Sequence, residues 1–327
     1  AFVFYPSLCY RYGWVGITLL WVAVPATLFS AYIFGWRWRR LRVTSPVEFV
    51  EERYNATLRQ IFVWQGIPVR IMDDSMKLFA TGKFVSIITQ IPIEYSIILV
   101  GGIILLCTFL GGLWAVTITD FIQFLVLGAG LLVILPLSIH SAGGLTRIFG
   151  ELPEGSFNLT HSEYPWSYVL PLIVLYAFSW SSINWSLIQR YYCVKDEKEV
   201  KKVGLTVILL YIMGPPLMFF PAFAGRLIFP DLKDAGDIYP LLCAKLLPAG
   251  MLGLLISAMF SATMSTLSSD YNVCASVITQ DVYRRLFRPK ANNRELIFVG
   301  RISTFIVGLI ALLISFYLSR GKAENLF

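Results

Sequence analysis

Hydroxyl-bearing residues are unusually dense in one apolar stretch in the carboxyl-terminal third of the sequence. Ser265, Thr266, Ser268 and Ser269 make four of the five residues from 265 to 269 hydroxyl-bearing. A hard monovalent cation needs several oxygen ligands and little net negative charge, which hydroxyls and a freed backbone carbonyl supply. The alternative is a packing seam, because small residues let membrane helices approach closely and hydroxyls can bond to their own helix carbonyls.

These hydroxyls belong to a longer polar stripe, whose members are separated by steps that keep them on one helix face. The stripe comprises Ser257, Ser261, Ser265, Ser268, Ser269, Asn272 and Ser276. Lipid tails offer no hydrogen-bond partners to such a polar face. We therefore expect the stripe to face protein or a cavity.

A second group of polar residues interrupts another apolar stretch, in the segment RIMDDSMK. Steps of three and four residues place both Lys77 and Arg70 beside Asp73 and Asp74, so the four charges can neutralise one another. The alternative is that they line the solute or ion path, since buried charges in a membrane are costly and usually face a cavity. Asp73, Asp74 and Lys77 are therefore candidates for solute binding or gating.

The elements that must position these residues are membrane-spanning helices. The chain has 327 residues, of which 57% are apolar and 14% charged, and its mean hydropathy is +0.68. Apolar runs of about 20 residues recur along it, each long enough to cross a hydrocarbon core of roughly 30 Å. We predict about eight spans, at 14–36, 58–92, 95–113, 116–140, 166–190, 203–228, 249–281 and 296–318.

The basic residues indicate the orientation of these spans. Clusters of Arg and Lys follow the first, fifth and seventh predicted spans. Because cytoplasmic loops are enriched in Arg and Lys, odd-numbered spans run inward and the amino terminus lies outside. The formal charge of +7 is thus a topology signal, and no nucleic-acid partner is expected. The five cysteines show no CxxC spacing and are odd in number, so neither a disulfide framework nor a metal site is indicated, and no cofactor is predicted.

Three motifs together resemble the sodium:solute symporter family, which includes sodium-coupled sugar, proline and sialic acid transporters. They are GLLISAMFSATMSTLSSDYNVCASVITQDVY at 253–283, GGLWAVTITDFIQ at 111–123 and NWSLIQR at 184–190. The motifs occur in the order, and on the membrane sides, that this family expects, and the resemblance covers essentially the whole chain. Its fold would be all-α and polytopic, part of an inverted-repeat transporter core of about ten helices.

The resemblance also implies site residues. The family's main sodium site takes a backbone carbonyl and two adjacent hydroxyls from one helix, which correspond to Ala262, Ser265 and Thr266. Some members hold a second sodium ion closer to the cytoplasm, and this pattern matches Ser265, Ser268 and Ser269 with a carboxylate from Asp120. The alternative for Asp120 is a helix cap at the membrane interface.

The family resemblance also implies roles for two residues of the fifth predicted span. Sugar-transporting relatives have an aromatic residue near Trp180 that resembles an inner gate, and an Asn or Asp at the position of Asn184. Trp185 departs from the Gln that these relatives often have, which argues against a sugar substrate. The alternative for Trp180 is packing or interfacial anchoring.

These observations predict an integral protein of the plasma or inner membrane that performs sodium-coupled symport of a small organic solute and is not an enzyme. Its expected partners are sodium, the solute and membrane lipid. We expect residues 1–327 to be one transporter domain that is truncated at both ends, because the family's core has a further helix on each side. A transporter-like sensory domain and a passive channel or structural membrane protein are the alternatives.

Overall fold

The computed structural model describes residues 2–42, 48–182 and 184–320; within them, the side chains of residues 110–120, 123, 182, 185, 186, 189 and 192 lie outside the description. The described part is helical throughout, apart from one isolated bridge between His161 and Tyr164 and the connecting turns. This confirms the predicted all-α class.

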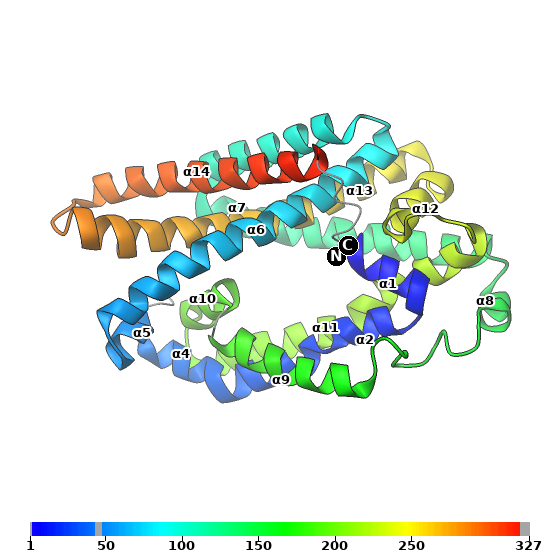
Figure 1. Cartoon of the computed structure of the whole chain (residues 1–327), viewed down its shortest axis with the longest axis horizontal. Coiled ribbons are helices and arrows are strands. Elements are labelled where there is room, and N and C mark those ends of the chain that lie inside the picture. The colour runs from blue at the N-terminus through cyan, green and yellow to red at the C-terminus, as the bar shows by residue number, and fades with distance from the viewer. Residues whose placement is uncertain (1, 43–47, 183, 321–327) are drawn as a thin grey trace. The chain divides into compact units, whose positions relative to one another are not determined.

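The helices follow one another along the chain as Figure 1 shows. The α-helices are α1 (Phe4–Tyr12), α2 (Val15–Trp21), α3 (Ala23–Phe29), α4 (Trp36–Leu41), α5 (Glu48–Arg53), α6 (Ala56–Thr89), α7 (Ile93–Ser141), α8 (Leu145–Glu151), α9 (Trp166–Ser182), α10 (Trp185–Cys193), α11 (Glu197–Ile228), α12 (Ile238–Leu246), α13 (Ala249–Val277) and α14 (Asn293–Arg320). Two π-helical segments, η1 (Ser30–Gly35) and η3 (Ile278–Phe287), and one 3₁₀ turn, η2 (Ala235–Asp237), complete the order.

Five helical stretches in the described part are long and apolar enough to cross a membrane. They are Val15–Leu41, Phe124–Ser141, Glu197–Ile228, Ala249–Phe287 and Asn293–Arg320, and two shorter apolar helices cover Ile93–Phe109 and Trp166–Ser181. These seven stretches overlap seven of the predicted spans. The remaining predicted span, 58–92, corresponds to α6, whose length is sufficient but whose central segment carries the charges of RIMDDSMK.

Three predicted spans differ from the observed helices. The structure assigns α7 as continuous helix where the sequence suggested separate spans at 95–113 and 116–140. Gly111 and Gly112, near the end of the first of these two spans, lower helix propensity but, unlike proline, leave the backbone donors that a helix needs. Conversely, the predicted span 166–190 is divided into α9 and α10.

The break between α9 and α10 is stabilised by hydrogen bonds within this part of the chain. Asn184 begins α10 as its N-cap, because its side-chain oxygen accepts a hydrogen bond from Leu187 N at 3.3 Å. The last carbonyls of α9 also find donors, which satisfies groups that a helix end would otherwise leave unpaired. Ser179 O accepts from Asn184 N at 2.9 Å, Trp180 O from Ser30 Oγ at 3.2 Å, and Ser181 O from Trp38 Nε1 at 2.7 Å.

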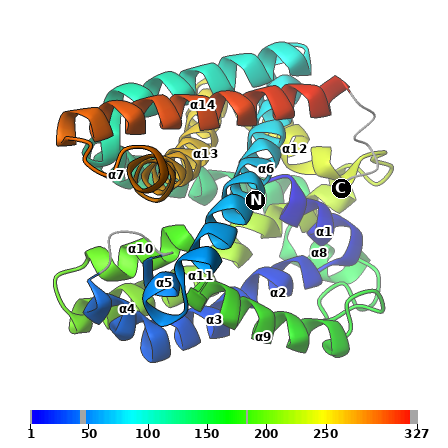
Figure 2. The same ribbon diagram turned by 60° about the vertical axis from the view of Figure 1, so that its left-hand side comes forward.

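The chain divides into two compact units, each built from separated parts of the sequence. Unit 1 comprises the described residues of 1–42 and 128–254, and unit 2 those of 43–127 and 255–327. In unit 1, α3 packs against both α9 and α11, as Figure 2 also shows. Its core includes the parallel rings of Phe157 and Phe223, whose centroids are 5.4 Å apart.

Unit 2 holds the two groups of polar residues that the sequence singled out. Helix α14 packs along α6, and the apolar core of the unit joins residues of α6, α7, α13 and α14, including Leu78, Ile97, Tyr271 and Val307. Tyr271 and Leu267 of α13 lie in this core. The packed face of α13 is therefore distinct from the face that bears Ser265 and Ser269.

A second set of charges joins α5, the start of α6 and η3 in the same unit. Arg285 and Arg59 both donate hydrogen bonds to the carboxylate of Glu51, and Arg59 also donates to the buried Asp281. The Arg285 guanidinium, followed by that of Arg59, lowers the pKa of Glu51 from its ordinary 4.5 to about 2. These pairs tie the two short charged segments to the long helices.

Candidate functional site: the hydroxyl face of α13 and the charges of α6

Three of the predicted sodium ligands, Ala262, Ser265 and Thr266, lie within two turns of α13. Thr266 Oγ1 donates a hydrogen bond to the carbonyl oxygen of Ala262 at 3.1 Å. This contact brings two of the predicted ligand atoms together, in the back-bonding arrangement that hydroxyls adopt in apolar helices. A cation bound here would take the place of the hydroxyl proton at the Ala262 oxygen.

Ser268 is fully buried, and its hydroxyl lies 2.7 Å from that of Thr108 on α7. Thr108 Oγ1 in turn donates to Ile104 O at 2.8 Å. A hydroxyl has one proton to donate, so Ser268 must be the donor in its contact with Thr108. The lone pairs of Ser268 thus stay available to accept a hydrogen bond or to bind a cation.

Ser265 and Ser269 are half-buried on the same helix. Within the described part of the chain, neither hydroxyl has a hydrogen-bond partner from another side chain or from the backbone. Oxygens of this kind, partly shielded from solvent and without a competing donor, suit the coordination of a hard cation. The sixth predicted ligand, Asp120, has a side chain outside the described residues.

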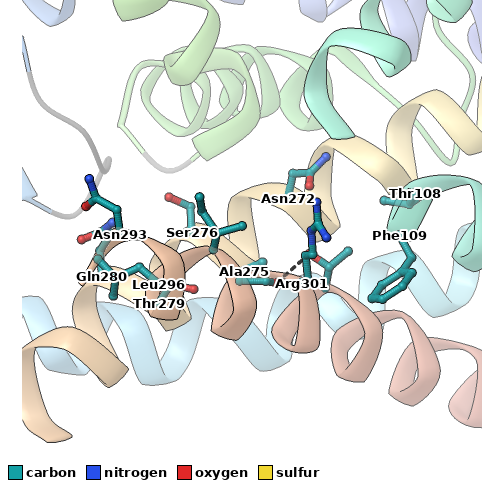
Figure 3. A pocket seen from close by; sticks show the side chains of 13 residues that line it. Thr108, Phe109, Asn272, Ala275, Ser276, Thr279, Gln280, Asn293, Leu296 and Arg301 are labelled. Carbon is teal, nitrogen blue, oxygen red and sulfur yellow. Dashed lines mark hydrogen bonds between the residues drawn. The ribbon is translucent and has the colours of Figure 1, made fainter. Parts of the chain in front are cut away.

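The carboxyl-terminal end of the polar stripe lines a pocket of about 580 Å³ in unit 2 (Figure 3). Asn272 and Ser276 of α13 contribute to it, with Thr108 of α7, Thr279 of η3 and Arg301 of α14. Asn272 Nδ2 and Thr279 Oγ1 are buried and find no hydrogen-bond partner among the described residues. Since each water takes up about 30 Å³ in the liquid, the pocket has room for a hydrated ion beside the hydroxyl segment.

The charged segment of α6 forms ion pairs, as the helical spacing predicted for Lys77. Its Nζ lies 2.8 Å from Asp73 Oδ2 and 3.1 Å from Asp74 Oδ1. Arg70 behaves differently from the expectation, because its Nη1 contacts Asp270 Oδ1 of α13 at 3.1 Å. Lys77 contacts the same carboxylate at 2.9 Å, through Oδ2.

Asp270 is the residue that sequence reasoning missed. It directly follows the hydroxyl segment, and its side chain is only 3% exposed. The sequence contained a signal for it, because an acidic residue in an apolar membrane helix needs a charged or polar partner. The sequence did not show which helix supplies that partner. Asp270 connects the two groups of polar residues, since it lies one position after Ser269 and bonds to both cationic side chains of α6.

The two candidates of the fifth predicted span occupy structural positions in unit 1. Trp180 packs against Tyr176 and Tyr211, with ring centroids 6.0 and 5.7 Å apart. Asn184 is the N-cap of α10. The contacts of Trp180 match its packing alternative, and a role of either residue as gate or solute ligand stays a prediction.

Known proteins resemble this chain over almost its whole length. Residues 1–322 match the model of the family described as "Sodium:solute symporter family". The sodium/sialic acid symporter NanT of Aliivibrio fischeri is 25% identical over 100% of this chain and 68% of its own length. The osmoregulated proline transporter OpuE of Bacillus subtilis is 26% identical over 92% of this chain and 64% of its own length.

A rabbit relative is longer still. The sodium/myo-inositol cotransporter 2 of Oryctolagus cuniculus is 25% identical over 91% of this chain, which spans 48% of that protein. A solved structure of a Na⁺-coupled sialic acid symporter has the same fold, with a TM-score of 0.88 and 23% identity over 99% of this chain and 72% of that one. The chain is an integral protein of the plasma membrane, as its composition and apolar helices indicated, and it belongs to the sodium:solute symporter family.

Proposed function

We propose that this chain is the part of a sodium-coupled symporter that carries the coupling-ion ligands, and that the whole protein moves a small organic solute with sodium. Family membership carries this proposal, together with the hydroxyl face of α13. Residues 1–327 would act as one transporter domain in spite of their two compact units.

The sodium ions would bind along α13. The carbonyl of Ala262 and the hydroxyls of Ser265 and Thr266 would form the main site. Ser265, Ser268 and Ser269, with Asp120, would form a second site. Three of these hydroxyls have lone pairs to offer, because Ser265 and Ser269 lack partners in the described chain and Ser268 acts as donor to Thr108.

Sodium binding would stabilise the conformation that binds solute, so each ligand would raise the affinity for the other. A membrane potential of about 100 mV contributes about 2.3 kcal/mol per sodium ion. Tenfold accumulation of an uncharged solute costs about 1.4 kcal/mol. One ion is therefore sufficient for substantial uptake, and a second ion would make accumulation steeper.

The solute is proposed as a small polar organic molecule, in keeping with the sialic acid, proline and myo-inositol that name the relatives. Candidates for its path are Asp73, Asp74 and Lys77 of α6 and Trp180 and Asn184 of unit 1. The charged cluster is the stronger of these groups, because its side chains combine buried carboxylates with an ammonium.

The test is uptake of labelled sugars, amino acids and carboxylates by the complete protein in vesicles, with and without a sodium gradient. Ser265→Ala should lose sodium-dependent uptake of whichever solute is transported. Ser303→Ala, the same change at a buried position of α14, is the matched control and should transport normally. Uptake that depends neither on the sodium gradient nor on Ser265 would indicate a passive channel. The hydroxyl face would then be a packing seam between helices.

A further inference from the structure

Five charged side chains meet between α6 and α13, and we call them the α6/α13 charge cluster: Arg70, Asp73, Asp74, Lys77 and Asp270. When all three carboxylates are ionised, they face two cationic groups, which leaves one negative charge in excess. An uncompensated charge is expensive wherever water is scarce. The cluster as a whole therefore favours one further positive charge.

The carboxylate oxygens of the cluster differ in whether they contact a cationic side chain. Lys77 Nζ contacts one oxygen from each carboxylate, at 2.8, 3.1 and 2.9 Å for Asp73, Asp74 and Asp270. An ammonium has three protons, so these contacts use all of them. Arg70 takes the second oxygen of Asp270, at 3.1 Å.

These contacts leave two carboxylate oxygens, Asp73 Oδ1 and Asp74 Oδ2, and only Asp74 Oδ2 belongs to a buried side chain. Asp74 Oδ2 is buried and has no hydrogen-bond partner among the described residues, and the Asp74 side chain is 0% exposed. A buried carboxylate oxygen without a donor is costly, since the group has lost its water and gained no replacement. A proton or a bound cation would satisfy this atom.

The spacing of the carboxylates suits an ion. One oxygen from each of Asp73, Asp74 and Asp270 lies within 4.8 Å of the others. Oxygens on opposite sides of a bound hard cation are separated by at most about 5 Å, given metal–oxygen distances of about 2.3–2.6 Å. Asp73, whose side chain is 55% exposed, would provide access from outside the cluster.

We propose that Asp74 Oδ2, with oxygens of Asp73 and Asp270, forms a binding site for one additional monovalent cation. A single charge balances the excess, whereas a divalent ion would leave the cluster positive. Two sources share this chemistry, a sodium ion and the ammonium group of a transported solute. The proposal deepens the proposed function, on which it rests only where it concerns coupling to transport.

The first measurement is the number of radioactive sodium ions bound by the purified complete protein. If sodium is the occupant, Asp74→Asn should bind one ion fewer than the unmodified protein. Asp231→Asn makes the same change at an exposed loop position and should bind the unmodified number.

The second measurement separates the two sources. If a solute ammonium is the occupant, Asp74→Asn should bind the unmodified number of sodium ions but lose inhibition of uptake by ethylammonium. Propanol, which is uncharged and of similar size, is the control for nonspecific inhibition. A folded Asp74→Asn protein that keeps both its sodium count and its inhibition by ethylammonium would overturn the proposal.

Lys77→Gln decides the question if Asp74→Asn does not fold. Without the lysine the cluster holds two negative charges in excess. The melting temperature of the Lys77→Gln protein should therefore rise with sodium or ethylammonium concentration more steeply than that of the unmodified protein. Equal slopes for the two proteins would overturn the proposal. Sodium-dependent uptake by the unmodified protein tests the proposed function separately, and it can succeed even where this site fails.

Discussion

Lys77 and Asp270 form an ion pair of 2.9 Å although 193 positions separate them in the sequence. The pair joins α6 to α13 beside the hydroxyl segment, and both residues contact further charges of the cluster. A partly buried, shared pair of this kind fixes which faces of two helices meet. Its loss should therefore affect stability and ion binding together.

Lys77→Met should destabilise the complete protein by about 3–5 kcal/mol, because it leaves buried carboxylates without their main partner. Denaturant unfolding in detergent measures this change. The control is Lys202→Met, which removes an ion pair to Glu199 whose two side chains are 72% and 40% exposed. Exposed pairs contribute about 0–1 kcal/mol, so equal losses in the two variants would contradict a buried role for Lys77.

The Thr108–Ser268 contact should influence sodium activation if Ser268 binds the ion. Thr108→Val removes the acceptor of the Ser268 proton while keeping the shape of the side chain, and it should raise the sodium concentration for half-maximal uptake several-fold. Thr108→Ser restores the hydroxyl and should return sodium activation towards normal. If Thr108→Ser, which keeps the hydroxyl, behaves like Thr108→Val, loss of the hydrogen bond to Ser268 does not explain the change in sodium activation.

Glu51 should make stability depend on pH in the acid range. Its pKa falls from 4.5 to about 2 in the folded protein because Arg285 and Arg59 bond to the carboxylate. A lowered pKa means that the contribution to stability is fully present above about pH 4.5 and is lost as the pH falls towards 2. The melting temperatures of the unmodified protein and Glu51→Gln should differ near neutral pH and converge in acid, whereas a constant difference would exclude the ion pairs as its cause.

Two glycines in unit 2 should respond oppositely to alanine. An added methyl group at Gly82 would overlap the side chain of Ile97 and lie 3.2 Å from its Cα atom, whereas nothing lies within 4 Å of one at Gly102. Gly82→Ala should therefore cost about 1–3 kcal/mol through overpacking between α6 and α7. Gly102→Ala should be neutral or stabilising by up to about 1 kcal/mol, since alanine favours the helix. Unfolding of both variants under the same conditions checks the pair.

Local spacing accounts for what the sequence could predict. Lys77 follows Asp73 and Asp74 by four and three residues, and one helical turn brings them together whatever surrounds the helix. The hydroxyl segment was equally visible, because four such residues in five are rare in an apolar run. The membrane class followed from composition and from span lengths.

Contacts between distant segments could not be predicted from local spacing. Periodicity shows which face of a helix is polar but not which helix that face meets, so neither the partner of Arg70 nor the Thr108–Ser268 contact could be foreseen. The break before Asn184 was missed because no proline or glycine marks it in the segment from 178 to 190. Asparagine at that position was a possible signal, as it is a favoured N-cap.

The three hydrogen bonds at the end of α9 have a consequence for how this segment can vary among related sequences. Ser30 and Trp38 donate to carbonyls of α9, and Asn184 holds the start of α10. Replacement of Trp38 by a residue without a side-chain hydrogen-bond donor would leave the Ser181 carbonyl without its partner. A longer helix that is unbroken at 184 would then be favoured. Substitutions at positions 30, 38 and 184 should therefore be inherited together, and their co-variation would trace this break through the family's history.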